Sequence, residues 1–142
     1  MTEAAEVAAE DTSFFVEDFD LWPLVSVHLA RPATCSAEVE AFGDRMAGIL
    51  HVARFGKTPT RIKILLVIDG IVDSPLEHQM LAAGIISRLR DDARAAVEAT
   101  ALVASSSVVR AIVNFVLTLQ PLQSRHEIFE TSEDALEWLQ AQ

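Results

Sequence analysis

The chain has 142 residues, of which 51% are hydrophobic, and its 21 acidic and 11 basic side chains give a formal net charge of −10. This length suits one domain, and the apolar fraction excludes an intrinsically disordered chain. The negative charge argues against nucleic acid as a partner, the single cysteine excludes an internal disulfide, and no apolar run approaches the ~20 residues that span a membrane.

The acidic residues are concentrated at the two ends of the chain. Residues 1–20 contain seven acids and no base, and residues 126–142 contain five acids and no Lys or Arg. Residues 21–125 therefore hold nine acids and all 11 basic residues. We expect residues 1–12 to form a flexible acidic leader and residues 13–142 to form the folded domain. The leader is acidic where a signal peptide would be basic, which favours a cytoplasmic location.

The first half of the domain predicts a hairpin, a helix and a central strand. Residues 14–16 and 24–29 are two strand candidates joined by a polar and aromatic segment. Apolar residues recur at helical spacing between residues 36 and 53, and Gly56 is the stop signal. The predicted inward stripe of this helix comprises Val39, Phe42, Met46, Ile49, Leu50 and Ala53. The run 62–68 is apolar on both faces, as expected of a strand in the middle of a sheet.

The next segment predicts a long helix. Ser74-Pro75-Leu76-Glu77 combines a serine N-cap, a proline at the first helical position and a glutamate three residues after the cap. We expect this helix to continue to about Arg94. Its predicted inward face comprises Leu76, Met80, Gly84, Ile85 and Leu89.

Strands and helices continue to alternate up to the end of the chain. Residues 100–104 predict a buried strand, and three serines at 105–107 can cap a helix over residues 108–119. Residues 127–129 predict a last short strand, and Thr131 caps a final helix. The alternation predicts an α/β fold with a mainly parallel sheet of four to five strands, an N-terminal hairpin and about four helices.

Two segments of the C-terminal third resemble a known family. Residues 100–115, TALVASSSVVRAIVNF, are similar to a strand, a serine-rich turn and an "RAI-NF" helix. Residues 128–139, IFETSEDALEWL, are similar to a closing strand and an "EEAL-WL" helix. Both resemble the STAS domain (sulfate transporter and anti-sigma-factor antagonist) in its SpoIIAA-like branch, which borders the lipid-binding SEC14-like folds. The resemblance extends over about residues 14–140 and implies a STAS-like bacterial regulatory domain that binds another protein. We expect no cofactor.

The resemblance also implies a phosphorylated Ser or Thr at the start of the second helix. In the matching stretch Asp69 ends the strand, Asp73 and Ser74 precede the helix, and Pro75-Leu76 stands where the family has Ser-Gly. Ser74, Asp73 and Asp69 are therefore the candidate phosphoacceptor or partner site. The alternative is structural, because Ser74 is equally a helix N-cap and Asp69 a turn residue before Gly70.

A candidate anion site lies at the end of the following strand. It comprises Ser105, Ser106, Ser107 and Arg110, at a helix start whose N–H groups favour negative charge. Helix capping alone is the alternative, because no glycine-rich phosphate loop accompanies these residues.

The four histidines and Cys35 are not at ligand spacing, so we expect no metal site. No acid, base and nucleophile come together in the pattern, so we expect no enzyme.

The helix predicted over residues 108–119 has almost no polar face. A surface helix should be apolar on one side only, which makes Val109, Ile112, Val113 and Val116 a candidate interface. This helix either contacts a protein partner, most simply a second copy in a homodimer, or covers a cavity for a small apolar or lipid-like ligand. The space beneath this helix distinguishes the two alternatives. An interaction module should fill that space with side chains, whereas a ligand carrier should leave it open. The leading interpretation is a non-enzymatic regulatory module of STAS type that binds a protein partner.

Overall fold

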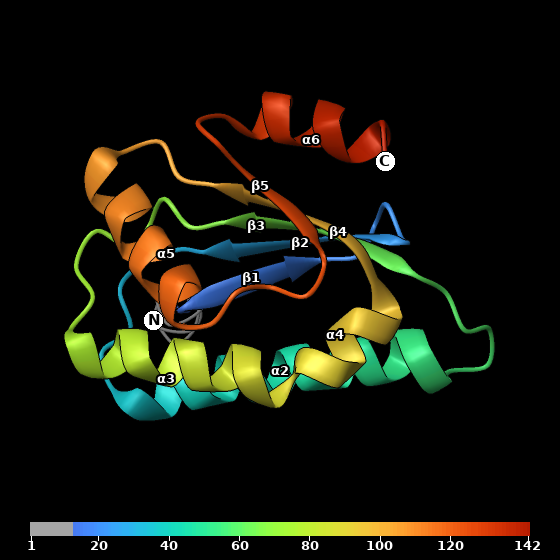
Figure 1. The fold of residues 1–142 in the computed structure, drawn as a ribbon, viewed down its shortest axis with the longest axis horizontal. Helices are drawn as coiled ribbons and strands as arrows, with labels where there is room; N and C mark the ends of the chain where they lie inside the picture. The colour runs from blue at the N-terminus through green and yellow to red at the C-terminus, as the bar shows by residue number, and fades with distance from the viewer. Residues whose placement is uncertain (1–12) are drawn as a thin grey trace, which may run out of the picture.

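The computed structural model describes residues 13–142, so the predicted leader at residues 1–12 lies outside the described residues. Its centre is a five-stranded sheet with the order β1-β2-β3-β4-β5 (Figure 1). The strands are β1 (Phe15–Asp18), β2 (Leu24–Leu29), β3 (Ile62–Val67), β4 (Val97–Val103) and β5 (Arg125–Phe129). β1 pairs antiparallel with β2, and all other neighbouring strands are parallel. The predicted α/β fold with an N-terminal hairpin is confirmed.

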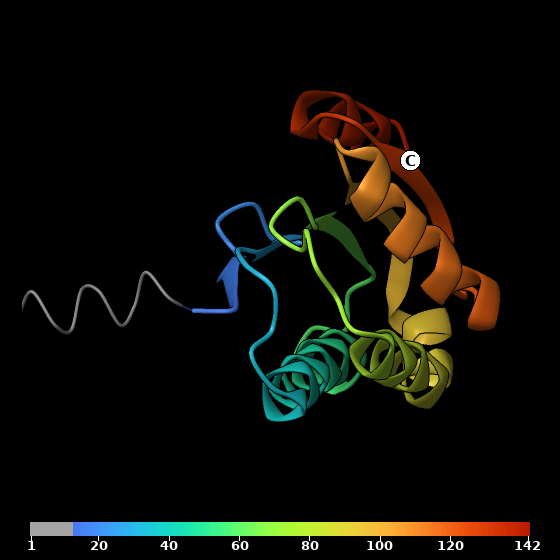
Figure 2. The ribbon, with the colours of Figure 1, turned by 90° about the vertical axis from the view of Figure 1, so that its left-hand side faces the viewer.

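Within the described residues, five helices cover this sheet. They are α2 (Ser36–Phe55), α3 (Leu76–Arg88), α4 (Arg90–Ala96), α5 (Ser107–Leu119) and α6 (Ser132–Gln140). Figure 2 shows α6 on one side of the sheet and α2 and α3 side by side on the other. α5 packs against α3, and α4 packs against α2.

Alternation along the strands divides the core between the two faces of the sheet. On the face of α6, Leu65, Ala99, Ala101 and Val103 pack against Ala135 and Leu139. On the opposite face, one cluster joins Val25, Val27, Ile62 and Ile64 to α2 and α4, and another joins Leu29, Ile68 and Leu102 to α5. The inward stripe predicted for α2 is confirmed, because all six of its residues belong to these clusters or line the space between them.

Two helix caps in the C-terminal half follow the predictions. The Ser106 hydroxyl accepts a hydrogen bond from the backbone N–H of Val109, so one of the three serines caps α5. The Thr131 hydroxyl accepts a hydrogen bond from the backbone N–H of Asp134 and caps α6. Each bond satisfies one of the unpaired donors at a helix start.

The predicted helix from Ser74 to Arg94 is wrong at its start and in its length. Pro75 occupies the N-cap position with no side-chain cap, so Ser74 lies one residue too early to cap the helix. Glu77 accepts a hydrogen bond from the hydroxyl of Ser36 on α2 instead of closing a capping box. Leu89, with φ −91° and ψ 5°, leaves helical geometry and separates α3 from α4.

The predicted inward face is wrong at three of its five positions, while Leu89 packs against the core as predicted. Leu76 is 63% exposed and Met80 52% exposed, and Gly84 is exposed as well, whereas Ile85 is buried as predicted. The side chains turned toward the sheet are instead those of His78, Gln79, Ala82, Ile85 and Ile86. Apolar residues occur on all sides of α3, so the sequence period does not select which side is inside.

Candidate functional site

An apolar cavity of about 240 Å³ lies between the sheet and helices α2, α3 and α5. Its floor is formed by strand residues, and its roof by side chains of the three helices. Representative lining residues are Ile64, Leu66 and Leu102 from the sheet, Phe42 and Met46 from α2, Ala82 and Ile86 from α3, and Ile112 and Leu117 from α5. An apolar cavity of about 150 Å³ is large enough to bind benzene, so this space has room for a larger apolar ligand.

Such a cavity is costly for a small domain when nothing fills it. Protein interiors are close-packed and hold few voids larger than a water molecule, so an unfilled space of about 240 Å³ is unusually large. The packing of α2, α3 and α5 therefore favours an occupant over a void.

One end of the cavity is polar. Thr100, on β4, is the single buried polar residue of residues 13–142, and its Oγ1 lies 3.1 Å from the Oγ of Ser124. Gln123, next to Ser124 in the connection between α5 and β5, accepts a hydrogen bond of 2.8 Å from Arg94 of α4. Arg90 also lines the cavity, and its position one helical turn before Arg94 places it on the side of α4 that faces Gln123. Polar groups from three parts of the chain thus converge on one end of an apolar space.

The candidate phosphoacceptor Ser74 borders the cavity near the start of α3. Its backbone carbonyl accepts a hydrogen bond of 2.7 Å from Nε2 of Gln79, and the residue is half-buried. Asp73 beside it is exposed. His78 also lines the cavity, whereas Asp69 and Asp73 do not, so of the three residues predicted as a phosphoacceptor or partner site only Ser74 lies at its wall.

Asp69 and Ser105 come together at the carboxyl edge of the sheet. Oδ1 of Asp69 accepts hydrogen bonds from the backbone N–H of Ser105, at 2.6 Å, and from its hydroxyl, at 2.9 Å. The bonds tie the segment after β3 to the segment after β4. Asp69 therefore has a structural role here, and Ser74 takes part in neither bond.

The groups of the candidate anion site are engaged within the chain. Nη1 of Arg110 donates to the carbonyls of Ala104 and Ser105, at 3.2 and 3.1 Å, and forms an ion pair of 3.5 Å with Glu130. Ser106 caps α5, while Ser107 is exposed at its first position. An anion at this helix start would compete with Glu130, and the site stays a prediction.

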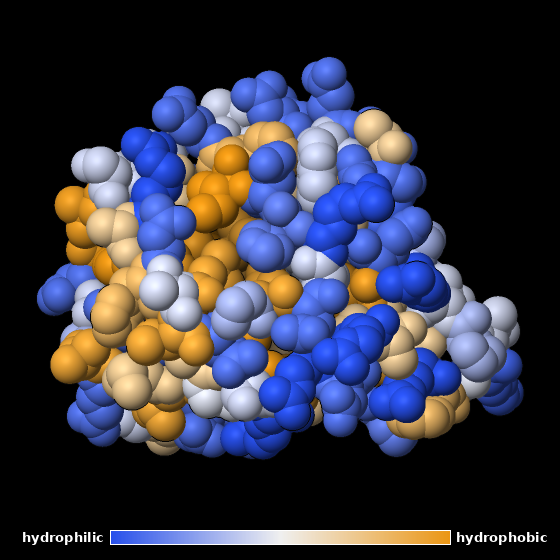
Figure 3. All heavy atoms as spheres, viewed as in Figure 1, coloured by the Kyte–Doolittle hydropathy of each residue, from blue (hydrophilic) through white to orange (hydrophobic). Residues whose placement is uncertain are grey.

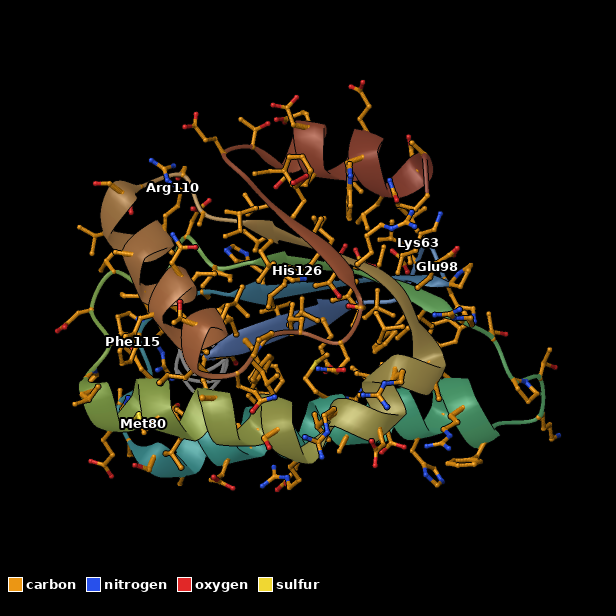
Figure 4. The ribbon with its side chains drawn as sticks, in the orientation of Figure 1. Lys63, Met80, Glu98, Arg110, Phe115 and His126 are labelled. Atoms are coloured by element: carbon orange, nitrogen blue, oxygen red, sulfur yellow. The ribbon has the colours of Figure 1, made fainter. Side chains whose placement is uncertain are left out.

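The four residues of the candidate interface on α5 are directed inward. Val109, Val113 and Val116 are buried and Ile112 is half-buried, because this side of the helix covers the core and the cavity. The exposed large apolar side chains of α5 are Val108, Phe115 and Leu119. Figure 3 shows apolar surface over α3 and α5, and Figure 4 places Met80 and Phe115 on these two helices. A partner contacting α5 would therefore meet these residues and not the four predicted ones.

An ion pair anchors the start of α2, which forms one wall of the cavity. Arg31 donates to both carboxylate oxygens of Glu38, at 2.9 and 2.6 Å, and the backbone N–H of Thr34 donates to the same carboxylate at 2.7 Å. The side-chain hydrogen bond from Arg31, followed by the backbone bond from Thr34, lowers the pKa of Glu38 from 4.5 to about 2. The same pairing raises the pKa of Arg31.

Residues 13–142 contain neither a cluster of metal ligands nor a helix suited to a membrane. No three His, Cys, Asp or Glu side chains of this range lie together so as to hold a metal ion. In the same range, no helix combines the length and apolar character that crossing a bilayer requires.

The polar end of the cavity was missed by sequence reasoning. Its members Arg90, Thr100, Gln123 and Ser124 are spread over 35 positions and follow no motif. One signal was present, since Thr100 is a polar residue in the otherwise apolar strand run Thr100-Ala101-Leu102-Val103-Ala104. Its direction toward the cavity depends on the register of β4 against β3.

The architecture defines an α/β module with a SpoIIAA-like fold. A solved structure described as an uncharacterized protein from the DUF3478 family with a SpoIIAA-like fold, from Shewanella loihica PV-4, matches with a TM-score of 0.56 and 17% identity. The match covers 88% of this chain and 91% of that chain, which confirms the STAS/SpoIIAA-like fold predicted by resemblance. Residues 87–142 match a family described as a domain of unknown function, DUF7793. No curated protein matches the chain.

Proposed function

We propose that this chain is a non-enzymatic module that binds a small apolar, lipid-like ligand between the sheet and helices α2, α3 and α5. The observation that carries this proposal is the open apolar space of about 240 Å³ beneath α5 and α3. An interaction module of the same fold would be expected to close that space with side chains. The SpoIIAA-like fold is compatible with this role.

The walls of the cavity explain how an apolar ligand would be held. They are aliphatic and aromatic over most of their area, so binding is driven by removal of apolar surface from water. Each buried methylene contributes about 0.8 kcal/mol, so eight of them contribute about 6 kcal/mol. Filling the space also offsets the cost of the cavity.

Filling the cavity by mutation tests the proposal. Ala82 of α3 lines the cavity, so Ala82→Leu places a larger side chain in the ligand space. Ala111 of α5 is exposed and outside the cavity, so Ala111→Leu is the matched control. With naphthalene, an apolar fluorophore of ten carbons, as the fluorescent probe, we expect A82L to weaken binding about tenfold and A111L to leave it unchanged. A82L should also stabilise the unliganded protein by about 1 kcal/mol in denaturant titrations.

Two results would contradict the ligand-binding proposal. One is the absence of probe binding by the wild-type protein. The other is equal probe binding by the wild type and A82L, which would place the probe on the outer surface. Mass spectrometry of the purified protein provides an independent measurement, since a bound native lipid would be released on denaturation.

A second candidate function is a STAS-type regulatory interaction with a protein partner or a second copy. It is favoured by the apolar outer surface, where Leu76, Met80 and Phe115 are 63%, 52% and 39% exposed. Phosphorylation at Ser74 belongs to this candidate. Light scattering of the wild type and of a Met80→Glu, Phe115→Glu double variant tests self-association: a dimer lost in the variant supports it, and a monomer at all concentrations rejects the homodimer.

A further inference from the structure

We infer that the ligand is a single-chain carboxylic acid whose carboxylate lies at the polar end of the cavity, beside Arg90, Thr100, Gln123 and Ser124. Its apolar chain extends beneath α3 toward His78. The inference rests on the proposed function and specifies the chemical class of ligand.

Arg90 supplies the charge that an acid requires. Among the cavity-lining residues of the described chain, it is the single side chain with a full charge at neutral pH. Its Nε lies 3.9 Å from Asp91, whose side chain is 82% exposed, so the pairing is loose and solvated. The neighbouring Asp92 is engaged by Arg54 at 2.7 Å. The guanidinium therefore retains donors for a planar carboxylate.

The two hydroxyl groups at this end leave a donor for the ligand. Thr100 Oγ1 and Ser124 Oγ lie 3.1 Å apart and share one hydrogen bond. Each hydroxyl has one O–H donor, so a single bond between them leaves one O–H available. Because Thr100 is only 6% exposed, a ligand oxygen in the cavity would satisfy that donor in place of bulk water.

Gln123 completes a set of groups that can donate to an anion. Its Oε1 already accepts the hydrogen bond from Arg94, so its remaining hydrogen-bonding capacity lies mainly in the two N–H donors of the amide. Guanidinium, hydroxyl and amide donors at one end favour an anionic head over a neutral alcohol.

The volume of the apolar part of the cavity limits the length of the ligand's hydrocarbon chain. Benzene in an apolar cavity of about 150 Å³ corresponds to roughly 25 Å³ per carbon, so about 240 Å³ holds about ten carbons. Apolar residues of α2, α3, α5 and the sheet line the path away from Arg90, down to the His78 end. A saturated acid of medium chain length matches both the volume and the one-sided polarity.

Decanoate and decanol have the same number of carbons and differ in the head group, so comparing them separates the contribution of the carboxylate to binding from that of the hydrocarbon chain. We expect calorimetric titration of the wild type to show tighter binding of decanoate than of decanol. Arg90→Gln should weaken decanoate about tenfold and leave decanol unchanged. Arg88→Gln is the matched control, because Arg88 has the same 50% exposure but faces Glu40 and Asp44 of α2; it should leave both ligands unchanged. Thermal melts of both variants check that they fold.

Different results would contradict the carboxylate inference and the proposed ligand-binding function. If R90Q leaves decanoate binding unchanged, or weakens both ligands equally, the carboxylate inference is wrong while the apolar cavity still binds a ligand. Equal binding of decanoate and decanol by the wild type has the same meaning. If neither compound binds the wild type, and the fluorescent probe does not bind either, the proposed function itself fails.

Discussion

The two faces of the sheet are covered by helices in different ways. α6 lies on a floor that includes Ala99 and Ala101 and presents Ala135 to it, and all three are fully buried. α3 and α5 instead lie over strand residues such as Leu66 and Leu102 and leave an apolar space above them. Both faces are apolar, yet one is filled by the chain itself and the other is not.

Side-chain size accounts for this difference. Alanines on strand and helix allow α6 to approach the sheet closely, so Leu139 of α6 is fully buried. The other floor carries larger aliphatic side chains, and α5 packs on α3 as well as over the sheet. The filled face stabilises the fold, and the looser face is the one at which we propose that a ligand binds.

Truncating one leucine on each face of the sheet should give the largest difference in the free energy of unfolding between the two faces. Leu139→Ala should lower the free energy of unfolding by about 3–4 kcal/mol, because it empties a filled site. Leu117→Ala, at the cavity wall, should cost only about 1 kcal/mol, because Leu117 already borders open space. Guanidinium titrations measure both losses. Equal losses would show that the cavity face is packed as tightly as the α6 face.

The anchor of α2 should have a smaller, pH-dependent effect. Glu38→Gln is expected to cost about 1–2 kcal/mol at neutral pH, since it removes the charge that Arg31 pairs with. The pKa of Glu38 is lowered to about 2 in the folded chain, so this advantage of the wild type is complete above about pH 4.5 and disappears as the pH falls through about 2.

A matched control for this anchor lies on the same helix. Glu40 forms a longer, exposed contact of 3.8 Å with Arg88, so Glu40→Gln should cost less than about 0.5 kcal/mol. An equal stability difference between the wild type and E38Q at pH 2 and pH 7 would contradict the assigned ion pair.

Two glycines of α2 test how closely the helices of the cavity face approach. A Cβ at Gly43 would lie 2.8 Å from Cδ1 of Ile85, whereas a Cβ at Gly48 would meet no atom within 4 Å. Gly48→Ala should stabilise the protein by about 0.5–1 kcal/mol through helix propensity. Gly43→Ala should lose about 1 kcal/mol, because the crowding against Ile85 exceeds that gain. Thermal melts compare the two, and a gain for both would contradict the close α2–α3 contact.

Most elements of the fold were predictable because their signals are local. The α2 stripe, the Ser106 and Thr131 caps and the alternation of strands and helices depend on neighbours within a few residues. The prediction failed where the local pattern was degenerate. α3 is apolar on several sides, so its rotation is set by α2 and α5 packing against it, and its break at Leu89 carries no proline or glycine signal.

The sequence by itself determined the fold class, the order of the elements and the apolar character of α5, since hydrophobic periodicity and capping signals act over short distances. Only the tertiary structure decided which side of α3 is inside, that the four valine and isoleucine residues predicted as an interface on α5 point inward, and that a cavity remains beneath these helices. Volume between elements depends on how side chains from distant segments fit together. The convergence of Arg90, Thr100, Gln123 and Ser124 is a property of that fit and not of any one segment.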